Sequence, residues 1–301
     1  MKQSNKTIGI VAHVDAGKTT FSEQLLYHTK SIKQRGRVDH KDSFLDTHTI
    51  EKERGITVFA DQGTFSYNGS TYYLIDTPGH VDFSPEMERS IQVMDYAIVI
   101  LSAVEGVEGH TETVWQLLQK HRVPVFFFIN KIDRVGADPE RVINDIKYNL
   151  TSDVFDITSE LIDGSLSEEL IEFIAEKDEE LLDAFMEGKN AQAYWRAAMQ
   201  KLIQTNQLFP CASGSALQDF GIKEFLEKVD LLTETRYSQE EAFSGRVYKI
   251  RHDENGMRIT FIKALSGKLQ VRDEVAYEKK EIYTKKKSLK FVLITEAHLK
   301  T

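Results

Sequence analysis

The sequence predicts an α/β fold in which a mainly parallel sheet carries helices on both faces, followed by an antiparallel β-barrel that is incomplete. Two observations predict this class. Apolar runs of strand length alternate with helix-like segments from residue 7 to residue 213, and from residue 242 apolar and polar residues alternate along the chain.

Five apolar runs are predicted to form the parallel strands. They cover residues 7–11, 72–75, 96–102, 123–130 and 208–213. Helix-like segments cover 19–29, 85–93, 108–121 and 139–150, and Pro139 is well placed to begin the last of these. A further strand-like run at 57–67 is joined by Asn68-Gly69-Ser70 to the next strand, which predicts a hairpin and one antiparallel strand.

Residues from about 151 to 205 interrupt this alternation and are predicted to form an inserted helical subdomain. They contain 13 acidic residues against 4 basic ones. Apolar residues at helical spacing would form its buried stripe, namely Leu170, Ile171, Ile174, Leu181, Leu182, Phe185 and Met186. The acidic outer face has two interpretations, a solvated surface or a docking surface for a basic partner.

The last part of the chain is predicted to begin a β-barrel. Residues 243–250, 258–265 and 269–277 alternate in polarity, with turn signals at Asp253-Glu254-Asn255-Gly256 and at Ser266-Gly267. Only 60 residues remain from Ala242 to the end, so an incomplete barrel is expected. The predicted domains are therefore residues 1–238, including the insert, and residues 242–301.

Composition predicts a soluble, cytoplasmic, monomeric protein. Hydrophobic residues make up 41% of the chain and charged residues 28%, as in globular proteins. The single cysteine, Cys211, excludes an internal disulfide and suits a reducing compartment. No apolar run approaches the ~18–20 residues of a membrane helix. The net charge is −9, yet the part from residue 242 onward is basic. This basic part is predicted either to bind RNA phosphates or to contain a flexible, lysine-rich tail.

A phosphate-binding loop is predicted at Ala12-His13-Val14-Asp15-Ala16-Gly17-Lys18-Thr19, which follows a strand and opens a helix. Its backbone N–H groups can surround phosphates, helped by the positive end of the helix. Lys18 would reach the β- and γ-phosphates, and the Thr19 hydroxyl would bind Mg²⁺. The predicted phosphate-binding residues are Asp15, Ala16, Gly17, Lys18, Thr19 and Thr20.

A switch is predicted at Asp76-Thr77-Pro78-Gly79-His80. Asp76 ends a strand and would place a carboxylate near the Mg²⁺, whereas Gly79 can bring its N–H close to the γ-phosphate. Upstream, Arg54-Gly55-Ile56-Thr57 lies where a second mobile segment is needed. Thr57 would complete the shell of Mg²⁺ ligands only while the γ-phosphate is present.

A guanine reader is predicted at Asn130-Lys131-Ile132-Asp133. The Asp133 carboxylate can accept hydrogen bonds from the guanine N1–H and exocyclic amine, which adenine does not offer together, while the Lys131 stem would pack over the base. Gly214-Ser215-Ala216, after the last strand, is expected to contact the guanine oxygen through backbone N–H groups, and Ser215, Ala216 and Leu217 are predicted nucleotide-binding residues. A phosphate loop, a switch and a guanine reader in this order predict a GTPase, and the reader argues against an ATPase.

These motifs resemble those of translational GTPases over residues 7 to about 276. The acidic insert is similar to that of elongation factor G and is not a feature of the shorter elongation factor Tu. Within that branch, Leu25-Leu26-Tyr27, Gly36-Arg37-Val38-Asp39 and residues 126–133 look like the tetracycline ribosomal-protection proteins.

The resemblance implies ribosome-stimulated hydrolysis of GTP to GDP and phosphate. His80 would orient the attacking water, Val14 and Ile56 would form a hydrophobic gate, and Asp15 would help to place the phosphates and a cation. The expected partners are ribosomal RNA and ribosomal proteins. Family members carry three further domains, and the resemblance implies that the 301 residues do not extend to them. Two alternatives therefore stay open, a translocase fragment of the elongation factor G type and a nucleotide-binding fragment without stimulated activity.

Overall fold

The computed structural model describes residues 4–32, 61–77, 84–238, 240–252, 256, 258–270, 273, 275–279, 282–286 and 290–294. The chain divides into two compact units, Met1–Glu234 and Thr235–Thr301, which are described separately.

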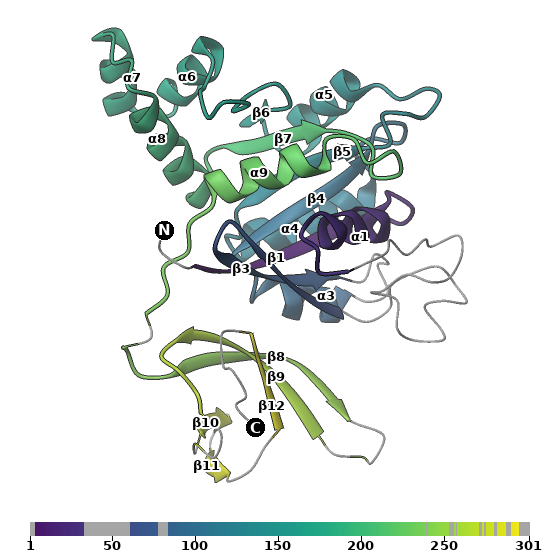
Figure 1. The fold of residues 1–301 in the computed structure, drawn as a ribbon, viewed down its shortest axis with the longest axis vertical. Coiled ribbons are helices and arrows are strands. Elements are labelled where there is room, and N and C mark those ends of the chain that lie inside the picture. The colour runs from purple at the N-terminus through teal and green to yellow at the C-terminus, as the bar shows by residue number, and fades with distance from the viewer. Residues whose placement is uncertain are drawn as a thin grey trace. The chain divides into compact units, whose positions relative to one another are not determined.

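The first unit is built on a seven-stranded sheet with the order β2-β3-β1-β4-β5-β7-β6 (Figure 1). Its strands are β1 (Asn5–Ala12), β2 (Asp61–Tyr67), β3 (Ser70–Asp76), β4 (Tyr96–Ser102), β5 (Val125–Asn130), β6 (Val154–Asp156) and β7 (Phe209–Ser213). All neighbouring strands pair in parallel except β2 and β3, which form the predicted hairpin. At its turn, Asn68 and Gly69 have φ of 47° and 82°, as a tight hairpin turn with the twist of the strands requires.

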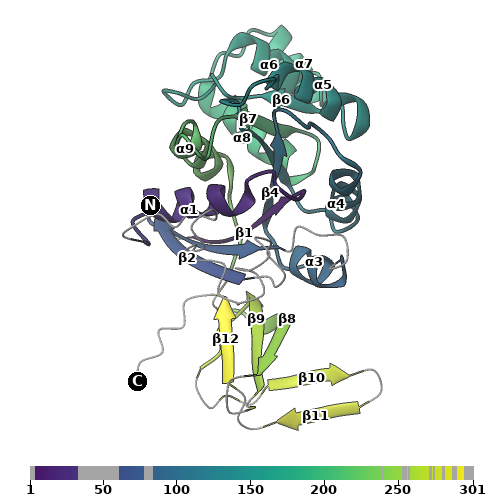
Figure 2. The same cartoon turned by 90° about the vertical axis from the view of Figure 1, so that its right-hand side faces the viewer.

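Helices cover both faces of this sheet, as Figure 2 shows. One face carries α1 (Lys18–His28) and α9 (Ile222–Leu232), and the other carries α3 (Ser84–Ile91), α4 (Gly109–Lys120) and α5 (Pro139–Asn149). The four helices predicted before the insert are thus confirmed to within two residues at each end. Pro139 begins α5, and the Asp138 side chain caps it by accepting a hydrogen bond from the Arg141 N–H at 3.0 Å.

Three consecutive phenylalanines show how the strands fill the two layers. Phe126 and Phe128 both lie against Phe225 of α9, and Phe127 lies against Trp115 of α4. All three phenylalanines are completely buried, because successive side chains of a strand point to opposite faces and both faces of this sheet are covered. The layers hold the carboxyl ends of β1, β3, β4, β5 and β7 along one edge, which is where an α/β sheet binds ligands.

Between β6 and β7 the chain forms α6 (Glu168–Ala175), α7 (Glu179–Met186) and α8 (Gln192–Gln204). The prediction of one apolar stripe was wrong for part of α7, because Leu182 and Met186 are 44% and 77% exposed. Asp178 caps a new helix there, so the helical period does not continue from α6. Strand β6 was also missed: three residues carry too little periodicity to predict a strand, yet they pair with β7 in the main sheet.

The second unit contains β8 (Ser244–His252), β9 (Arg258–Ser266), β10 (Val275–Lys279), β11 (Ile282–Lys286) and β12 (Lys290–Ile294). The antiparallel pairing of β8 with β9 agrees with the predicted alternation. The predicted strand at 269–277 begins instead at Val275, and β12 pairs with β9 in parallel. Polarity alternation carries no information on strand direction, which is why the parallel pair was not foreseen.

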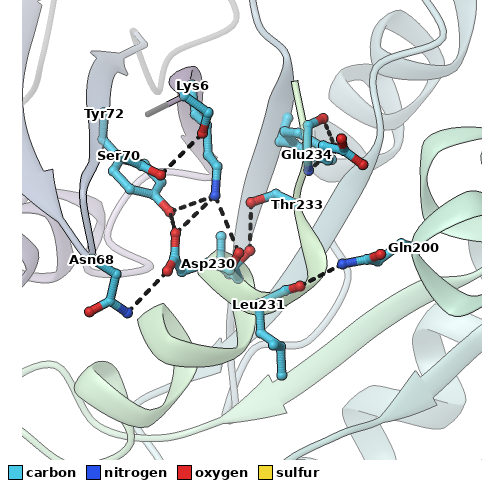
Figure 3. Close-up of polar contacts among 12 residues, drawn as sticks. Lys6, Asn68, Ser70, Tyr72, Gln200, Asp230, Leu231, Thr233 and Glu234 are labelled. Carbon is cyan, nitrogen blue, oxygen red and sulfur yellow. Dashed lines mark hydrogen bonds and ion pairs between the residues drawn. The ribbon is translucent and has the colours of Figure 1, made fainter. Parts of the chain in front are cut away.

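A buried polar network joins β1, β3 and α9 in the first unit (Figure 3). The Lys6 ammonium lies 2.9 Å from the Asp230 carboxylate and donates to the Tyr72 hydroxyl at 3.1 Å, and Tyr72 in turn donates to Asp230. Burial and the contact with Asp230 raise the pKa of Tyr72 well above its usual range, so its hydroxyl stays protonated as a donor. The network therefore ties α9 to the sheet at the edge opposite the strand carboxyl ends.

Replacing Lys6 with methionine is expected to lower the free energy of unfolding by about 3 kcal/mol, because it leaves Asp230 without its cation in a site that is 14% exposed. Urea denaturation of the 301-residue chain measures the loss. Lys223→Met is the matched control, since Lys223 forms an exposed pair with Glu227 on the same helix and should contribute less than about 1 kcal/mol. Equal stability of the two variants would contradict the role of the network.

Candidate nucleotide-binding site

The loop between β1 and α1 has the geometry of an anion-binding loop. Asp15 and Gly17 have φ of 64° and 94°, so the backbone turns its N–H groups inward ahead of the helix. No side chain caps α1, and the first N–H groups of a helix have no acceptor within it. A Cβ on Gly17 would lie 2.3 Å from Asn130 Nδ2, which restricts this position to glycine. The loop thus suits a phosphate ligand.

The side chains of this loop differ in exposure. Val14 is 39% exposed and Asp15 is also exposed, whereas Lys18 is 8% exposed. Thr19 and Thr20 are partly exposed on the first turn of α1, so the Thr19 hydroxyl is open to a ligand at the helix N-terminus. This placement fits a Mg²⁺ ligand, because Mg²⁺ prefers oxygen donors and is held through few protein groups together with phosphates.

The end of β3 lies directly beside the start of the phosphate loop. Asp76 is paired in register with Ile10, and the Thr77 hydroxyl and N–H both donate to the Ile10 carbonyl, at 2.7 and 3.3 Å. The backbone at the end of β3 therefore lies beside the strand that leads into the phosphate loop. Ile56, Thr57, Gly79 and His80 lie outside the residues that the structure describes.

Asn130 connects the phosphate loop to the loop between β7 and α9. Its side chain is buried, its Nδ2 donates to the Ala16 carbonyl at 2.8 Å, and its Oδ1 accepts from the Ala216 N–H at 2.8 Å. Both ends of the carboxamide are thus used within the protein. Asn130 therefore connects these two loops and fixes their relative position.

The rest of this motif is arranged to face a ligand. Lys131 has a φ of 66°, and its ammonium lies 3.5 Å from Glu105 Oε2, a contact that directs the lysine stem. Asp133 is exposed, and no protein partner of its carboxylate is recorded among the described residues. A carboxylate that is free at the end of β5 can accept from two donors of a base, as the motif predicts.

The first N–H groups of the β7–α9 loop (residues 214–221) are used within the protein. The N–H groups of Gly214, Ser215 and Ala216 donate to Ile129, Phe220 and Asn130 within the protein. The next N–H, that of Leu217, has no recorded acceptor within the described part of the chain, and the Leu217 side chain is 50% exposed. The loop therefore leaves the Leu217 N–H available to a ligand, because the three preceding N–H groups are used within the protein.

Three contacts of the site were not predicted from the sequence. Gln24 Nε2 donates to the Ala216 carbonyl at 2.8 Å, and His28 Nε2 lies 2.6 Å from Asp219 Oδ1. In the phosphate loop, His13 Nδ1 lies 3.3 Å from Glu108 Oε2, and its buried Nε2 has no hydrogen-bond partner among the described residues. None of the three had a local signal, because each contact joins residues that are far apart in sequence.

A mainly parallel sheet with an anion-binding loop after its first strand and an exposed carboxylate after β5 defines the class of P-loop GTPases. Within that class, the chain belongs to the family described as "Elongation factor Tu GTP binding domain", whose model matches residues 3–235.

Curated relatives are similar over most of this chain. The tetracycline resistance protein TetM from transposon Tn5251 of Streptococcus pneumoniae is 35% identical over 283 residues, which are 91% of this chain and 44% of that protein. TetP of Clostridium perfringens is 33% identical over 297 residues, 94% of this chain and 46% of TetP. The chain thus spans less than half the length of these relatives.

A solved structure supports the fold. The crystal structure of ttk003000868 from Thermus thermophilus superimposes with a TM-score of 0.81 at 22% identity, covering 94% of this chain and 50% of that one. Within the described residues, none of the helices is both long enough and apolar enough to cross a membrane.

Proposed function

We propose that this chain binds GTP and GDP with Mg²⁺ and hydrolyses GTP to GDP and phosphate, stimulated by the ribosome, as part of a protein related to the tetracycline ribosomal-protection proteins. The observation that carries the proposal is the Asn130 carboxamide, which joins the phosphate loop to the loop beside the base reader. A single nucleotide would span these two loops. The names of TetM and TetP support the protection branch.

The nucleotide would be held at both ends. At the phosphate end, the N–H groups of the loop from Asp15 to Thr20 and the Lys18 ammonium would bind the phosphates. At the other end, Asp133, the Lys131 stem and the Leu217 N–H would bind guanine, with Asn130, Ser215 and Ala216 keeping the loop closed. Thr19, Thr57 and Asp76 are the proposed Mg²⁺ ligands, and Mg²⁺ would neutralise charge on the β- and γ-phosphates.

Hydrolysis would depend on positioning and on stabilising charge. We assign His80 to orienting the attacking water, Gly79 to sensing the γ-phosphate, and Val14 and Ile56 to a hydrophobic gate. The 39% exposure of Val14 supports the gate, because an apolar side chain on this loop is open toward a ligand. Ribosomal RNA and ribosomal proteins are the proposed stimulating partners.

The same proposal extends to the domains. Helices α6–α8 would be the acidic insert of residues 151–205, and the strands after residue 242 would be the first part of a translation-factor barrel. The acidic side chains of α6 and α7 are all exposed, which supports an acidic outer face. The protein would be monomeric and cytoplasmic, in keeping with one buried, unpaired cysteine at position 211.

GTP turnover by the 301-residue chain, measured with and without ribosomes, tests the proposal. Strong stimulation would support it, whereas tight GDP binding without stimulation would favour the alternative of a nucleotide-binding fragment. A stimulated enzyme that promotes translocation would favour the elongation factor G alternative, and preference for ATP in competition would overturn the guanine assignment.

The substitution His80→Ala is expected to keep GDP affinity within about twofold and to lower ribosome-stimulated hydrolysis at least about 100-fold, because a general-base or water-positioning group typically contributes this much. Single-turnover hydrolysis measured beside GDP affinity checks the expectation. His110→Ala is the control for loss of a histidine elsewhere in the domain. An unchanged stimulated rate in His80→Ala would remove the catalytic role.

A further inference from the structure

Two side chains of α1 hold the β7–α9 loop. Gln24 is 5% exposed and donates to the Ala216 carbonyl at 2.8 Å, and His28 Nε2 lies 2.6 Å from Asp219 Oδ1. Residues 24 and 28 are four apart, so both side chains lie on the same face of the helix. Helix α1 therefore contacts this loop at two points one helical turn apart.

The same helix carries the phosphate loop at its other end. Its first residue is Lys18 and its last is His28, so one rigid element connects the phosphate-binding N–H groups to the loop beside the base. On the second side, Asn130 joins Ala16 to Ala216. The loop is thus held at Ala216 by Gln24 and Asn130 and at Asp219 by His28.

Leu217 and Gln218 lie between these two held positions. The Gln218 N–H donates to the Ser215 hydroxyl at 3.1 Å, while the Leu217 N–H has no recorded acceptor in the described residues. Asp219 has a φ of 57°, a left-handed conformation that Asp tolerates but that costs free energy for a residue with a Cβ. Leu217 thus lies two residues before Asp219, in the loop segment that the His28 contact holds at its outer end.

The pair is partly removed from water, which makes it stronger than an exposed one. The side chains of His28 and Asp219 are 21% and 22% exposed. A comparable pair elsewhere, His121 with Glu88 at 3.0 Å, has exposures of 20% and 32% and joins α3 to the end of α4. The pair of His121 and Glu88 lies on the opposite face of the sheet. It therefore serves as a control for the loss of a similar ion pair away from the β7–α9 loop.

We propose that His28 and Asp219 act as a positioning pair that aims the Leu217 N–H at the guanine oxygen and so sets how long the nucleotide stays bound. The inference rests on the proposed function, since it concerns the same nucleotide. Breaking the pair frees the loop at its outer end, so the base is held less well while the phosphate loop keeps its own hydrogen bonds.

The test measures dissociation of a fluorescent GDP analogue labelled on the ribose, using the 301-residue chain. His28→Ala and Asp219→Ala are each expected to speed dissociation about fivefold, and the double variant no more than either alone, because coupled residues are not additive. Asp219→Asn, which keeps an acceptor and tolerates the left-handed backbone, should stay within about twofold of the parent. His121→Ala should not change the rate.

A second readout separates positioning from general destabilisation. 6-Thioguanosine diphosphate keeps the N1–H and the amine but has sulfur, a weaker hydrogen-bond acceptor, in place of the guanine oxygen, so the parent chain should release it faster than GDP. In His28→Ala this difference should shrink, because the contact with the oxygen is already weakened. A parent chain that fails to bind GDP would overturn the proposed function itself. If the parent chain binds GDP, two results would overturn only the positioning pair. One is an unchanged dissociation rate in both single variants, and the other is a double variant in which the two single effects multiply.

Discussion

Replacing Asn130 with alanine is expected to weaken GDP binding by about 100-fold to 1,000-fold, the largest effect of any substitution that does not touch the nucleotide directly. The change removes two hydrogen bonds of 2.8 Å and leaves the Ala216 N–H and the Ala16 carbonyl buried without a partner. Each unpaired buried group costs about 1–3 kcal/mol, and each 1.4 kcal/mol is tenfold in affinity. Calorimetric titration with GDP measures the loss.

Two further variants test the reason for this effect. Asn149→Ala removes an asparagine whose Nδ2 donates to the Asp145 carbonyl on the surface of α5, and it should leave the affinity unchanged. Asn130→Asp keeps an acceptor for the Ala216 N–H but places a carboxylate against the Ala16 carbonyl. It should therefore weaken binding through the phosphate loop alone. GDP affinity within threefold of the parent in Asn130→Ala would contradict the bridging role.

Replacing Asp133 with asparagine is expected to change which base is bound. A carboxylate accepts hydrogen bonds from both the guanine N1–H and the exocyclic amine. The asparagine amide would instead place its own NH₂ donor against one of these two guanine donors. Hydrogen bonds to charged groups contribute about 1.5–3 kcal/mol each, so GDP affinity should fall at least about 100-fold. Xanthosine diphosphate has an oxygen in place of the amine, and it should bind the variant better than GDP does. Competition between the two nucleotides measures the exchange.

The control for this change in base preference is a second aspartate close by in the sequence. Asp138 caps α5 through the Arg141 N–H at 3.0 Å, and asparagine is an equally good cap, so Asp138→Asn should leave base preference unchanged. If Asp133→Asn keeps its preference for GDP over xanthosine diphosphate, Asp133 does not read the base.

The strands and helices around the site were predictable because each has a local signal. The apolar runs that became β1, β4, β5 and β7 are long enough to show burial on both faces, and the hairpin turn at Asn68-Gly69 has its own chemistry. Strand β6 has three residues, and β12 pairs in parallel with β9. Strand β6 and the β12–β9 pairing both depend on neighbours that are distant in the sequence, so no local pattern predicted them.

The sequence by itself determined β1, β3, β4, β5 and β7, the helices α1, α3, α4 and α5, the loop at Gly17 between a strand and a helix, and the place of Asp133 after a strand. These follow from local period and turn chemistry. Only the tertiary structure decided which groups remain free for a ligand. Asn130 bonds partners 114 and 86 residues away, and His28 meets Asp219 across 191 residues. Such hydrogen bonds form only after packing brings distant segments together, and they leave the Leu217 N–H without a recorded acceptor among the described residues.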